Sequence, residues 1–260
     1  MQFRTCVFCE SVSVRRFDLK TKRTLRGFSY CADCGGIAVL PEYFLPLQEQ
    51  RERYLKHRNS LADSGYKRFL CSFLEAVFAF NGGVCVHAAS ILDYGSGPEP
   101  ALVQLLRESA AGGAGVRPAA LPFLEQTRVV TGWDPFFAPD LPETDRAVAA
   151  AVSSSAMPEA TDGFDLVTCL EVAEHFEQPQ RGFAGIASRC KPGGYAAIGT
   201  LPIPADFPIP DGFSSWWYKD DRTHVSFYTE KAIAACGARA GLLYEGMASP
   251  RVFMFKKPPA

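Results

Sequence analysis

The stretch VHAASILDYGSGPEPALVQLL, residues 86–106, decides the fold. Apolar Ala88, Ala89, Ile91 and Leu92 predict a short buried strand. Residues 93–97 predict a tight turn, and 98–106 predict an amphipathic helix that begins at a proline. Glycines let a backbone approach a ligand closely, and the free amides in the first turn of a helix attract carboxylate or phosphate. The stretch therefore predicts a site for a nucleotide-like ligand, with an ordinary strand-to-helix turn as the alternative.

Three later stretches favour the ligand site over the ordinary turn. The run RVVTGWD reads as a second strand and ends at Asp134, whose carboxylate can accept hydrogen bonds from the two hydroxyls of a ribose. A third strand-like run, FDLVTCL, leads into Glu171, Glu174 and His175. The segment KPGG, residues 191–194, predicts a turn between a helix at about 181–190 and a strand at 195–200.

Together these motifs resemble the class I S-adenosylmethionine-dependent methyltransferases. The resemblance covers roughly residues 66–257 and rests on DYGSG at 93–97, Asp134, DLV at 165–167 followed by EVAEH at 171–175, and KPGG, all in family order. Two features depart from the family pattern. Glu99 and Pro100 stand where a third small residue is common, and Asp134 lies farther from Asp93 than the usual distance of about 20 residues. A Gly/Pro/Ala-rich insertion at 112–126, which we expect to be a surface loop, explains the longer spacing.

The resemblance implies S-adenosylmethionine as the cofactor and gives each motif a role. Gly95 and Gly97 would let the methionine end of the cofactor lie against the backbone, and Asp93 would stabilise that loop or contact the cofactor's ammonium group. Asp134 would accept both ribose hydroxyls, although an acid before a proline can also be a simple turn residue. The expected cofactor-binding residues are Asp93, Gly95, Gly97, Asp134, Phe136 next to the adenine, and Glu171 near the methionine.

Two Cys-x-x-Cys pairs near the N-terminus predict a metal site. Two thiolates of one such turn reach the same tetrahedral ion, and two turns complete a four-cysteine site. Four protein ligands leave no open coordination position, so we expect structural zinc, with disulfides or redox dithiols as alternatives. Zinc would also supply folding free energy that so short a segment lacks. The expected ligands are Cys6, Cys9, Cys31 and Cys34.

These features predict an α/β fold with three parts. We expect a zinc-ribbon-like module with a β-hairpin over residues 1–40 and a helical connector over 41–80. A methyltransferase domain over 81–260 would hold a Rossmann-like sheet with helices on both faces and an antiparallel hairpin at its end. Polar residues just before the apolar helix of the connector are candidates for ligand contact or for plain surface solvation. They are Tyr54, His57, Arg58 and Asn59.

The segment between the cysteine pairs is basic, which raises a nucleic-acid hypothesis. Clustered Lys and Arg attract phosphates, so the chain could be an RNA methyltransferase that grips its substrate with the zinc ribbon. The alternative is a solvated strand face, because the formal net charge of the whole chain is only −1. The basic residues are Arg15, Arg16, Lys20, Lys22, Arg23 and Arg26.

The segment FSSWWYKDDRTHVSFY, residues 213–228, predicts a lid over an acceptor pocket. His224 is our first candidate for a general base and His175 the second, although either can be a structural histidine. We expect aromatic walls, with core packing as the alternative, from Trp216, Trp217, Tyr218 and Tyr228. Because the sulfonium already activates the methyl group, the protein mainly aligns the reactants and excludes water, and no catalytic metal is required.

Composition favours a cytoplasmic enzyme, and our first hypothesis for its acceptor is a small molecule. Hydrophobic residues make up 47% of the 260 residues, enough for one full core and a small addition. No apolar run reaches the roughly 20 residues that cross a bilayer, so we expect no membrane contact. A third hypothesis remains open, in which the cofactor fold is a non-catalytic scaffold for partners.

Overall fold

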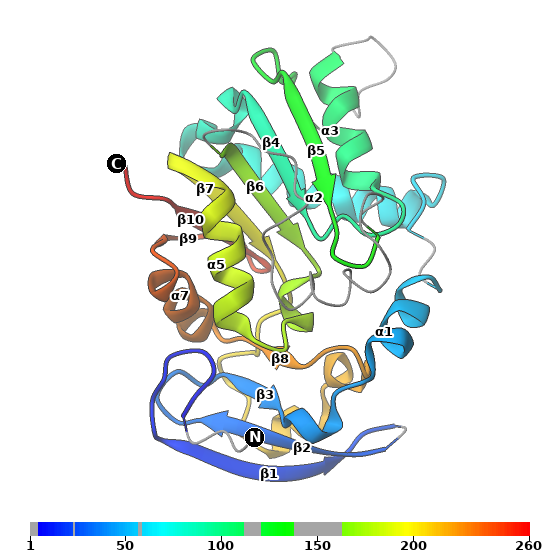
Figure 1. Cartoon of the computed structure of the whole chain (residues 1–260), viewed down its shortest axis with the longest axis vertical. Helices are drawn as coiled ribbons and strands as arrows, with labels where there is room; N and C mark the ends of the chain where they lie inside the picture. Colours follow the sequence, from blue (N-terminus) through cyan, green and yellow to red (C-terminus); the bar gives the residue numbers. More distant parts are fainter. Residues whose placement is uncertain (1–4, 23, 57–58, 112–120, 138–162) are drawn as a thin grey trace.

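Two β-sheets form the framework of the chain in the computed structural model, one of six strands and one of four (Figure 1). The structure describes residues 5–22, 24–56, 59–111, 121–137 and 163–260. His57, Arg58, Arg23 and most of the predicted insertion, residues 112–120, lie outside these ranges. Within the described ranges, no helix has both the length and the apolar character needed to cross a lipid bilayer.

The six-stranded sheet has the order β5-β4-β6-β7-β10-β9. The first four of these strands pair in parallel, while β10 runs antiparallel to both β7 and β9. This confirms the predicted Rossmann-like sheet and its closing antiparallel hairpin. The strands are β4 (Ser90–Tyr94), β5 (Val129–Trp133), β6 (Phe164–Leu170), β7 (Cys190–Gly199), β9 (Leu243–Ser249) and β10 (Val252–Lys256).

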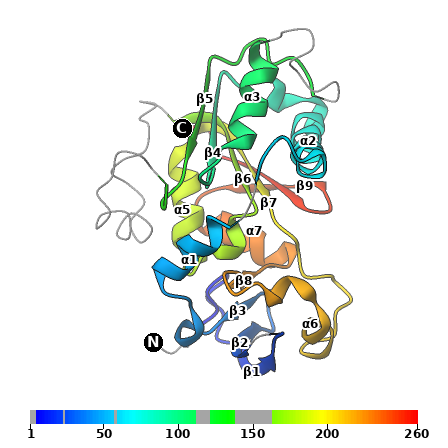
Figure 2. The ribbon, with the colours of Figure 1, turned by 90° about the vertical axis from the view of Figure 1, so that its right-hand side faces the viewer.

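Helices cover both faces of this sheet, as predicted. The helices α2 (Ser64–Ala79) and α3 (Ala101–Ala111) pack on one face, and α5 (Pro179–Arg189) and α7 (Glu230–Arg239) pack on the other (Figure 2). Successive side chains of β10 point to opposite faces of the sheet and so belong to two different cores. Met254 belongs to the core with α2 and α3, and Phe253 to the core with α5 and α7.

The N-terminal strands form the second sheet, in the order β1-β2-β3-β8. The predicted hairpin is present as β1 (Val14–Lys20) and β2 (Leu25–Cys31), followed by β3 (Ile37–Val39). The last strand, β8 (Ser226–Phe227), comes from the far end of the chain and pairs with β3. The N-terminal sheet is therefore built in part from the predicted methyltransferase domain, and our three-part division stays a prediction.

A third core joins the N-terminal sheet to the segment that precedes β8. Phe213 of α6 (Asp211–Ser215) has its ring centroid 5.2 Å from that of Phe28 on β2 and 5.2 Å from that of Phe227 on β8. Pro41–Tyr43 forms a 3-10 turn, and α1 (Leu47–Tyr54) then leads away from the N-terminal sheet toward the main one (Figure 1).

The predicted elements needed correction in three places. The helix begins at Ala101 instead of residue 98, because Pro100 disfavours a helical conformation for the residue before it. The strand before it covers 90–94 and not 88–92, since a 3-10 turn at Val84–His87 precedes it. The KPGG segment, predicted as a turn before a strand, lies inside β7, where the pairing with β6 shifts register.

Candidate active site

The predicted motifs meet at the carboxyl edge of the parallel strands. The strand β4 lies between β5 and β6, so the chain leaves it toward one side and later returns on the other. Such a reversal of strand order opens a crevice at the strand ends, where α/β proteins bind ligands. A cavity of about 1110 Å³ lies there, lined by the loop after β4, the ends of β5 and β6, and residues of α1 and α2. Its volume is at the upper end for ligand sites and can hold a cofactor together with a substrate.

The loop after β4 contains two glycines with left-handed backbones. Gly95 has φ +88° and Gly97 has φ +69°, a region that side chains disfavour. The Gly95 amide donates to the carbonyl of Trp133 over 2.7 Å, which ties the loop to β5. A Cβ atom at Gly95 would lie 2.5 Å from the Val172 side chain, whereas one at Gly97 would meet no atom within 4 Å. Gly97 therefore leaves its backbone open to the cavity.

Asp134 is joined directly to this loop. Its Oδ2 accepts a hydrogen bond from the Gly97 amide over 3.0 Å, and its Oδ1 accepts one from the Phe136 amide over 2.8 Å. Each oxygen retains a further lone pair for a hydroxyl donor. Burial raises the pKa of this carboxyl, although the two amides oppose the shift. The structure thus brings the glycine loop and the second-strand acid into one hollow.

Asp93 lies beneath the loop at the end of β4 and is 5% exposed. Its Oδ1 accepts a hydrogen bond from the Thr168 hydroxyl over 2.9 Å. Burial raises the pKa of Asp93 to about 7, and the nearby charge of Asp134 acts in the same direction. A positively charged ligand group next to Asp93 would favour its ionised form.

Glu171 follows β6 in a strained conformation with φ +52°. Its Oε1 accepts a hydrogen bond from the Arg251 guanidinium over 3.0 Å. Burial raises the pKa of Glu171 to about 7, and the charge of Glu174 adds to the shift. Glu171 lines the cavity beside the glycine loop, on the side predicted for the methionine end of the cofactor.

Aromatic rings close the cavity on the side of α1. The Tyr54 ring lies between those of Phe136 and His175, with centroid distances of 5.3 and 5.2 Å. Asn59 and Tyr66 also line the cavity. Two of the predicted connector candidates, Tyr54 and Asn59, are thus placed at the site.

The two candidate histidines face the same part of the cavity. Nδ1 of His175 lies 3.0 Å from the carbonyl oxygen of Thr223, and Nδ1 of His224 lies 2.8 Å from that of Tyr218. Since a carbonyl only accepts, each Nδ1 donates and each Nε2 carries a lone pair. Burial lowers the pKa of both imidazoles, that of His224 to about 3. Both rings are neutral at neutral pH, and His224 has little driving force to take a proton.

Comparison with known families agrees with this geometry. A family model described as a methyltransferase domain matches residues 52–245. The chain belongs to this methyltransferase family. No curated protein matches the sequence.

Solved structures of methyltransferases are similar at low sequence identity. An O-methyltransferase family protein from Burkholderia thailandensis is 17% identical, with 81% of this chain and 63% of that chain covered and a TM-score of 0.47. This methyltransferase chain therefore spans less than two thirds of that protein. The N-methyltransferase NodS from Bradyrhizobium japonicum, in complex with S-adenosylhomocysteine, is 13% identical, with 81% and 97% covered and a TM-score of 0.43. Magnesium protoporphyrin IX methyltransferase from Synechocystis, with bound S-adenosylmethionine, is 15% identical, with 83% and 94% covered and a TM-score of 0.41.

The aromatic residues expected to wall an acceptor pocket lie elsewhere in this methyltransferase. Trp216 packs in the third core, Tyr228 is fully buried and donates to the carbonyl of Ala173, and Trp217 is 62% exposed. Neither they nor Tyr218 lines the cavity. Trp216 and Tyr218 pack in the third core with residues of the N-terminal sheet, and Tyr228 packs in the core with α5 and α7. The segment 213–228 supplies Asp221 and His224 to the cavity instead.

The sequence did not predict a buried hydrogen-bond network around the carboxylate of Glu174. Glu174 is 0% exposed and accepts hydrogen bonds from the hydroxyls of Tyr218, over 2.7 Å, and Thr200, over 2.8 Å. Burial raises the pKa of Glu174. The sequence offered only the adjacency of Glu174 to His175, since neither hydroxyl partner is close in the chain.

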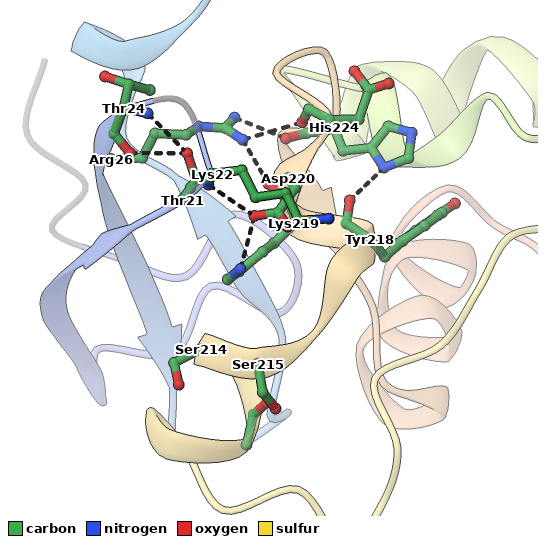
Figure 3. A network of polar contacts seen from close by, with 12 residues as sticks. Thr21, Lys22, Thr24, Arg26, Ser214, Ser215, Tyr218, Lys219, Asp220 and His224 are labelled. Atoms are coloured by element: carbon green, nitrogen blue, oxygen red, sulfur yellow. Dashed lines mark hydrogen bonds and ion pairs between the residues drawn. The ribbon is translucent and has the colours of Figure 1, made fainter.

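Arg26 of β2 holds the loop that carries His224 (Figure 3). This arginine, counted among the solvated basic residues in the sequence, is 2% exposed. Its guanidinium donates to the carbonyls of residues 219, 221, 222 and 224 over 2.8–3.3 Å. Burial lowers the pKa of Arg26 to about 10, so the group stays charged at neutral pH. Arg53 of α1 binds the same loop through Asp221, with an Nη2–Oδ2 distance of 2.7 Å.

The four N-terminal cysteines gather at one point. The Sγ atoms of Cys6 and Cys34 are 3.6 Å apart, those of Cys9 and Cys31 are 3.7 Å apart, and all four lie within 4.8 Å of one another. A tetrahedral zinc ion with Zn–S bonds of about 2.3 Å places its sulfurs about 3.8 Å apart. The spacing therefore fits a tetrahedral thiolate site with little adjustment.

Proposed function

We propose that this protein is an S-adenosylmethionine-dependent methyltransferase with a small-molecule acceptor. The observation that carries the proposal is the hydrogen bond between the Gly97 amide and the Asp134 carboxylate at the mouth of the cavity. This contact joins a ligand-accessible glycine loop to an acid with lone pairs to spare, at the reversal of strand order. Membership in the methyltransferase family supports the same conclusion.

The cofactor half of the cavity is the part next to the glycine loop. Asp134 accepts the two ribose hydroxyls, and Phe136 covers one side of the adenine. Gly95 and Gly97 allow the amino-acid end to lie on the backbone, with Asp93 and Glu171 as its negatively charged neighbours. The bound cofactor supplies a methyl group that its sulfonium already activates, so these residues need only hold and orient it.

The acceptor half is the part next to α1 and the loop 219–224. Tyr54, His175 and His224 line it, together with the ion-paired Asp221. A cavity of about 1110 Å³ leaves room here for a small acceptor beside the cofactor. Enclosure by α1 and the loop excludes water from the methyl group.

The four-cysteine cluster has a structural role in this proposal. Cys6, Cys9, Cys31 and Cys34 hold a zinc ion with no open position, so the ion takes no part in the reaction. The same cluster packs against the main core, because Phe8 has its ring centroid 5.2 Å from that of Tyr228. Zinc thereby fixes the N-terminal sheet on the rest of the protein.

Two of the five described basic residues between the cysteine pairs are engaged within the protein, whereas Arg15, Arg16 and Lys20 are exposed and keep the RNA hypothesis as the second candidate. The Arg26 guanidinium donates its hydrogen bonds to backbone carbonyls, and the Lys22 amine lies 3.9 Å from the Asp220 carboxylate. Neither offers an unengaged charge to a phosphate. The small-molecule reading is therefore the one we test first.

The test is methyl transfer from labelled S-adenosylmethionine to pools of small molecules and, separately, to RNA. We expect S-adenosylhomocysteine to form in step with label in a small molecule. Label in RNA, together with an affinity of the protein for RNA that falls steeply with salt, would show that RNA is the methyl acceptor. Absence of S-adenosylhomocysteine with every acceptor, while the cofactor still binds, would leave the scaffold hypothesis.

A further inference from the structure

Three side chains in the acceptor half of the cavity could share one ion. Ligand atoms of Glu174, His175 and His224 lie within 4.8 Å of one another. The two imidazole rings have centroids 4.9 Å apart and an interplanar angle of 70°. Two imidazoles and a carboxylate form a mixed nitrogen and oxygen donor set that suits divalent transition metals.

Both imidazoles are held as metal-binding histidines usually are. Each uses Nδ1 on a backbone carbonyl, that of Thr223 for His175 and that of Tyr218 for His224. Such an outer hydrogen bond fixes the ring and the tautomer and leaves Nε2 as the donor atom toward a metal. Both residues line the cavity.

Hydrogen bonds from neighbouring side chains also fix the carboxylate of Glu174. The hydroxyls of Tyr218 and Thr200 each donate to one of its oxygens. Among the described residues no lysine, arginine or histidine nitrogen lies within ion-pair distance of this buried carboxylate. A cation next to Glu174 would offset the cost of burying its charge.

The charge of the whole cavity also favours a cation. Its described lining includes one guanidinium, that of Arg181, against six carboxyl groups. Arg251 and Arg53, which are not part of the lining, pair with Glu171 and Asp221. The other four carboxyl groups face only Arg181 and one positively charged cofactor within the described lining. The six carboxyl groups belong to Asp93, Asp134, Glu171, Glu174, Glu177 and Asp221.

We propose that Glu174, His175 and His224 bind a divalent first-row transition metal ion that receives a hydroxyl group of the methyl acceptor. This inference rests on the proposed function, narrows it to transfer onto oxygen, and departs from our sequence-based expectation that the reaction requires no catalytic metal. Three protein ligands leave open positions for the acceptor oxygen. Coordination lowers the pKa of the hydroxyl, whose proton passes to solvent. The oxygen then forms a bond to the methyl carbon as the carbon–sulfur bond breaks, and the electron pair of that bond stays on sulfur.

Metal content measures the site without any need for activity. Purified protein is loaded with Co²⁺, dialysed, and assayed for zinc and cobalt by mass spectrometry. We expect one ion in the four-cysteine site and a second ion per chain that is lost in His175→Ala, His224→Ala and Glu174→Gln. His87→Ala is the matched control, since His87 is exposed outside the cavity, and it should keep both ions.

Optical spectra separate the two sites. Cobalt held by thiolates gives strong sulfur-to-metal charge-transfer absorption, and cobalt held by imidazole and carboxylate does not. A second ion that persists in all three variants, or no second ion in the wild type, would overturn the proposal. Because Glu174→Gln alters a buried network, circular dichroism of each variant must match the wild type, and His224→Ala decides the matter if Glu174→Gln unfolds.

Binding of S-adenosylmethionine, measured by calorimetry, distinguishes this inference from the proposed function. We expect all three variants to bind the cofactor within about threefold of the wild type, and methyl transfer to fall at least 100-fold in His175→Ala and His224→Ala. A wild-type rate of methyl transfer in a variant that lacks the second ion would contradict the role of the metal and leave the methyltransferase proposal intact. Loss of cofactor binding in the wild type would instead remove the proposed function.

Discussion

The two loop glycines have different surroundings, so a side chain at Gly95 should affect mainly stability and a side chain at Gly97 mainly cofactor binding. Gly95 faces the Val172 side chain, while Gly97 faces open space in the cavity. Both have left-handed backbones, which cost an alanine about 1 kcal/mol. Only at Gly95 does a clash with protein add to this cost.

We therefore expect Gly97→Ala to weaken S-adenosylmethionine binding at least tenfold, because the new methyl group occupies space that the cofactor needs. Its free energy of unfolding should fall by only about 1 kcal/mol. Gly95→Ala should lose distinctly more stability. Calorimetric titration and urea unfolding measure the two effects, and equal affinity of Gly97→Ala and wild type would contradict the placement of the cofactor.

Asp93 should make stability depend on pH. Its pKa in the folded protein is raised to about 7, so it stays protonated there at a pH where the unfolded chain is ionised. The contribution of Asp93 to the free energy of unfolding is fully present below about pH 4, near the pKa of an aspartate in the unfolded chain. This contribution is lost as the pH rises through about 7. Charged or titratable groups near Asp93 include Asp134, Tyr66 and Cys169.

The free energy of unfolding should accordingly be lower at pH 8 than at pH 5, and the drop should be smaller in Asp93→Asn. It should not vanish, since burial also raises the pKa of Asp134 and Glu174. Urea unfolding at the two pH values measures the drop. A drop of the same size in Asp93→Asn and wild type would show that Asp93 does not cause it.

At the residue scale, local patterns predicted the residues of the cofactor half and, in the acceptor half, Tyr54 and the two histidines but not the roles of Glu174 and Arg26. Asp93, Gly97 and Asp134 sit at strand ends and in turns, so local patterns place them at one edge of a sheet. Glu174 and Arg26 acquire their roles from partners far away in the chain. No local pattern separates a buried arginine on a strand from a solvated one.

At the scale of elements, the loop 219–224 is held from two sides. Arg26 of β2 binds its carbonyls, and Arg53 of α1 binds its Asp221 side chain. Behind the loop, the Val225 amide donates to the carbonyl of Glu174 over 2.8 Å. The position of His224 therefore depends on the N-terminal sheet.

Arg26→Ala should lower the free energy of unfolding by at least ~2 kcal/mol, because buried carbonyls lose their donors. Methyl transfer should fall as His224 shifts, with the affinity for S-adenosylmethionine little changed. Lys22→Ala is the control, since an exposed ion pair contributes at most about 1 kcal/mol. Full activity of a folded Arg26→Ala protein would contradict the positioning role.

One element of the family resemblance has a role away from the site. Asp165 at the start of β6 accepts hydrogen bonds from Ser90 and pairs with Lys191, whose Nζ lies 3.1 Å from Oδ1. These contacts join three parallel strands at the amino edge, opposite the cavity. The DLV and KPGG motifs thus explain why the strands align. Sequence could not show this, because the turn predicted at KPGG is part of β7.

At the scale of the whole molecule, the N-terminal module is part of the enzyme's core. Cys6, Phe8, Cys31 and Cys34 belong to the same core as α5 and α7. The Gln180 side chain of α5 donates to the carbonyl of Phe8 over 2.6 Å. The spacing of the four cysteines predicted that they would gather at one point, but it did not show which surface of the protein the module would cover.

Removal of zinc should therefore destabilise the whole protein. We expect a chelator to lower the unfolding temperature by at least about 5 °C, in step with zinc release. Cys9→Ser should lose the zinc, whereas Cys71→Ser, on α2 and away from the cluster, should retain it. An unchanged unfolding temperature after complete zinc release would contradict the structural role.

The most direct test of the account is calorimetric titration of S-adenosylmethionine into wild type, Asp134→Ala and Asp165→Asn. Asp134→Ala removes two charge-assisted hydrogen bonds to the ribose and should weaken binding at least about 100-fold, with the fold retained by circular dichroism. Asp165→Asn, on the opposite edge of the same sheet, should bind as the wild type does. Equal affinity of Asp134→Ala and wild type would contradict the claim that the glycine loop and Asp134 together hold the cofactor.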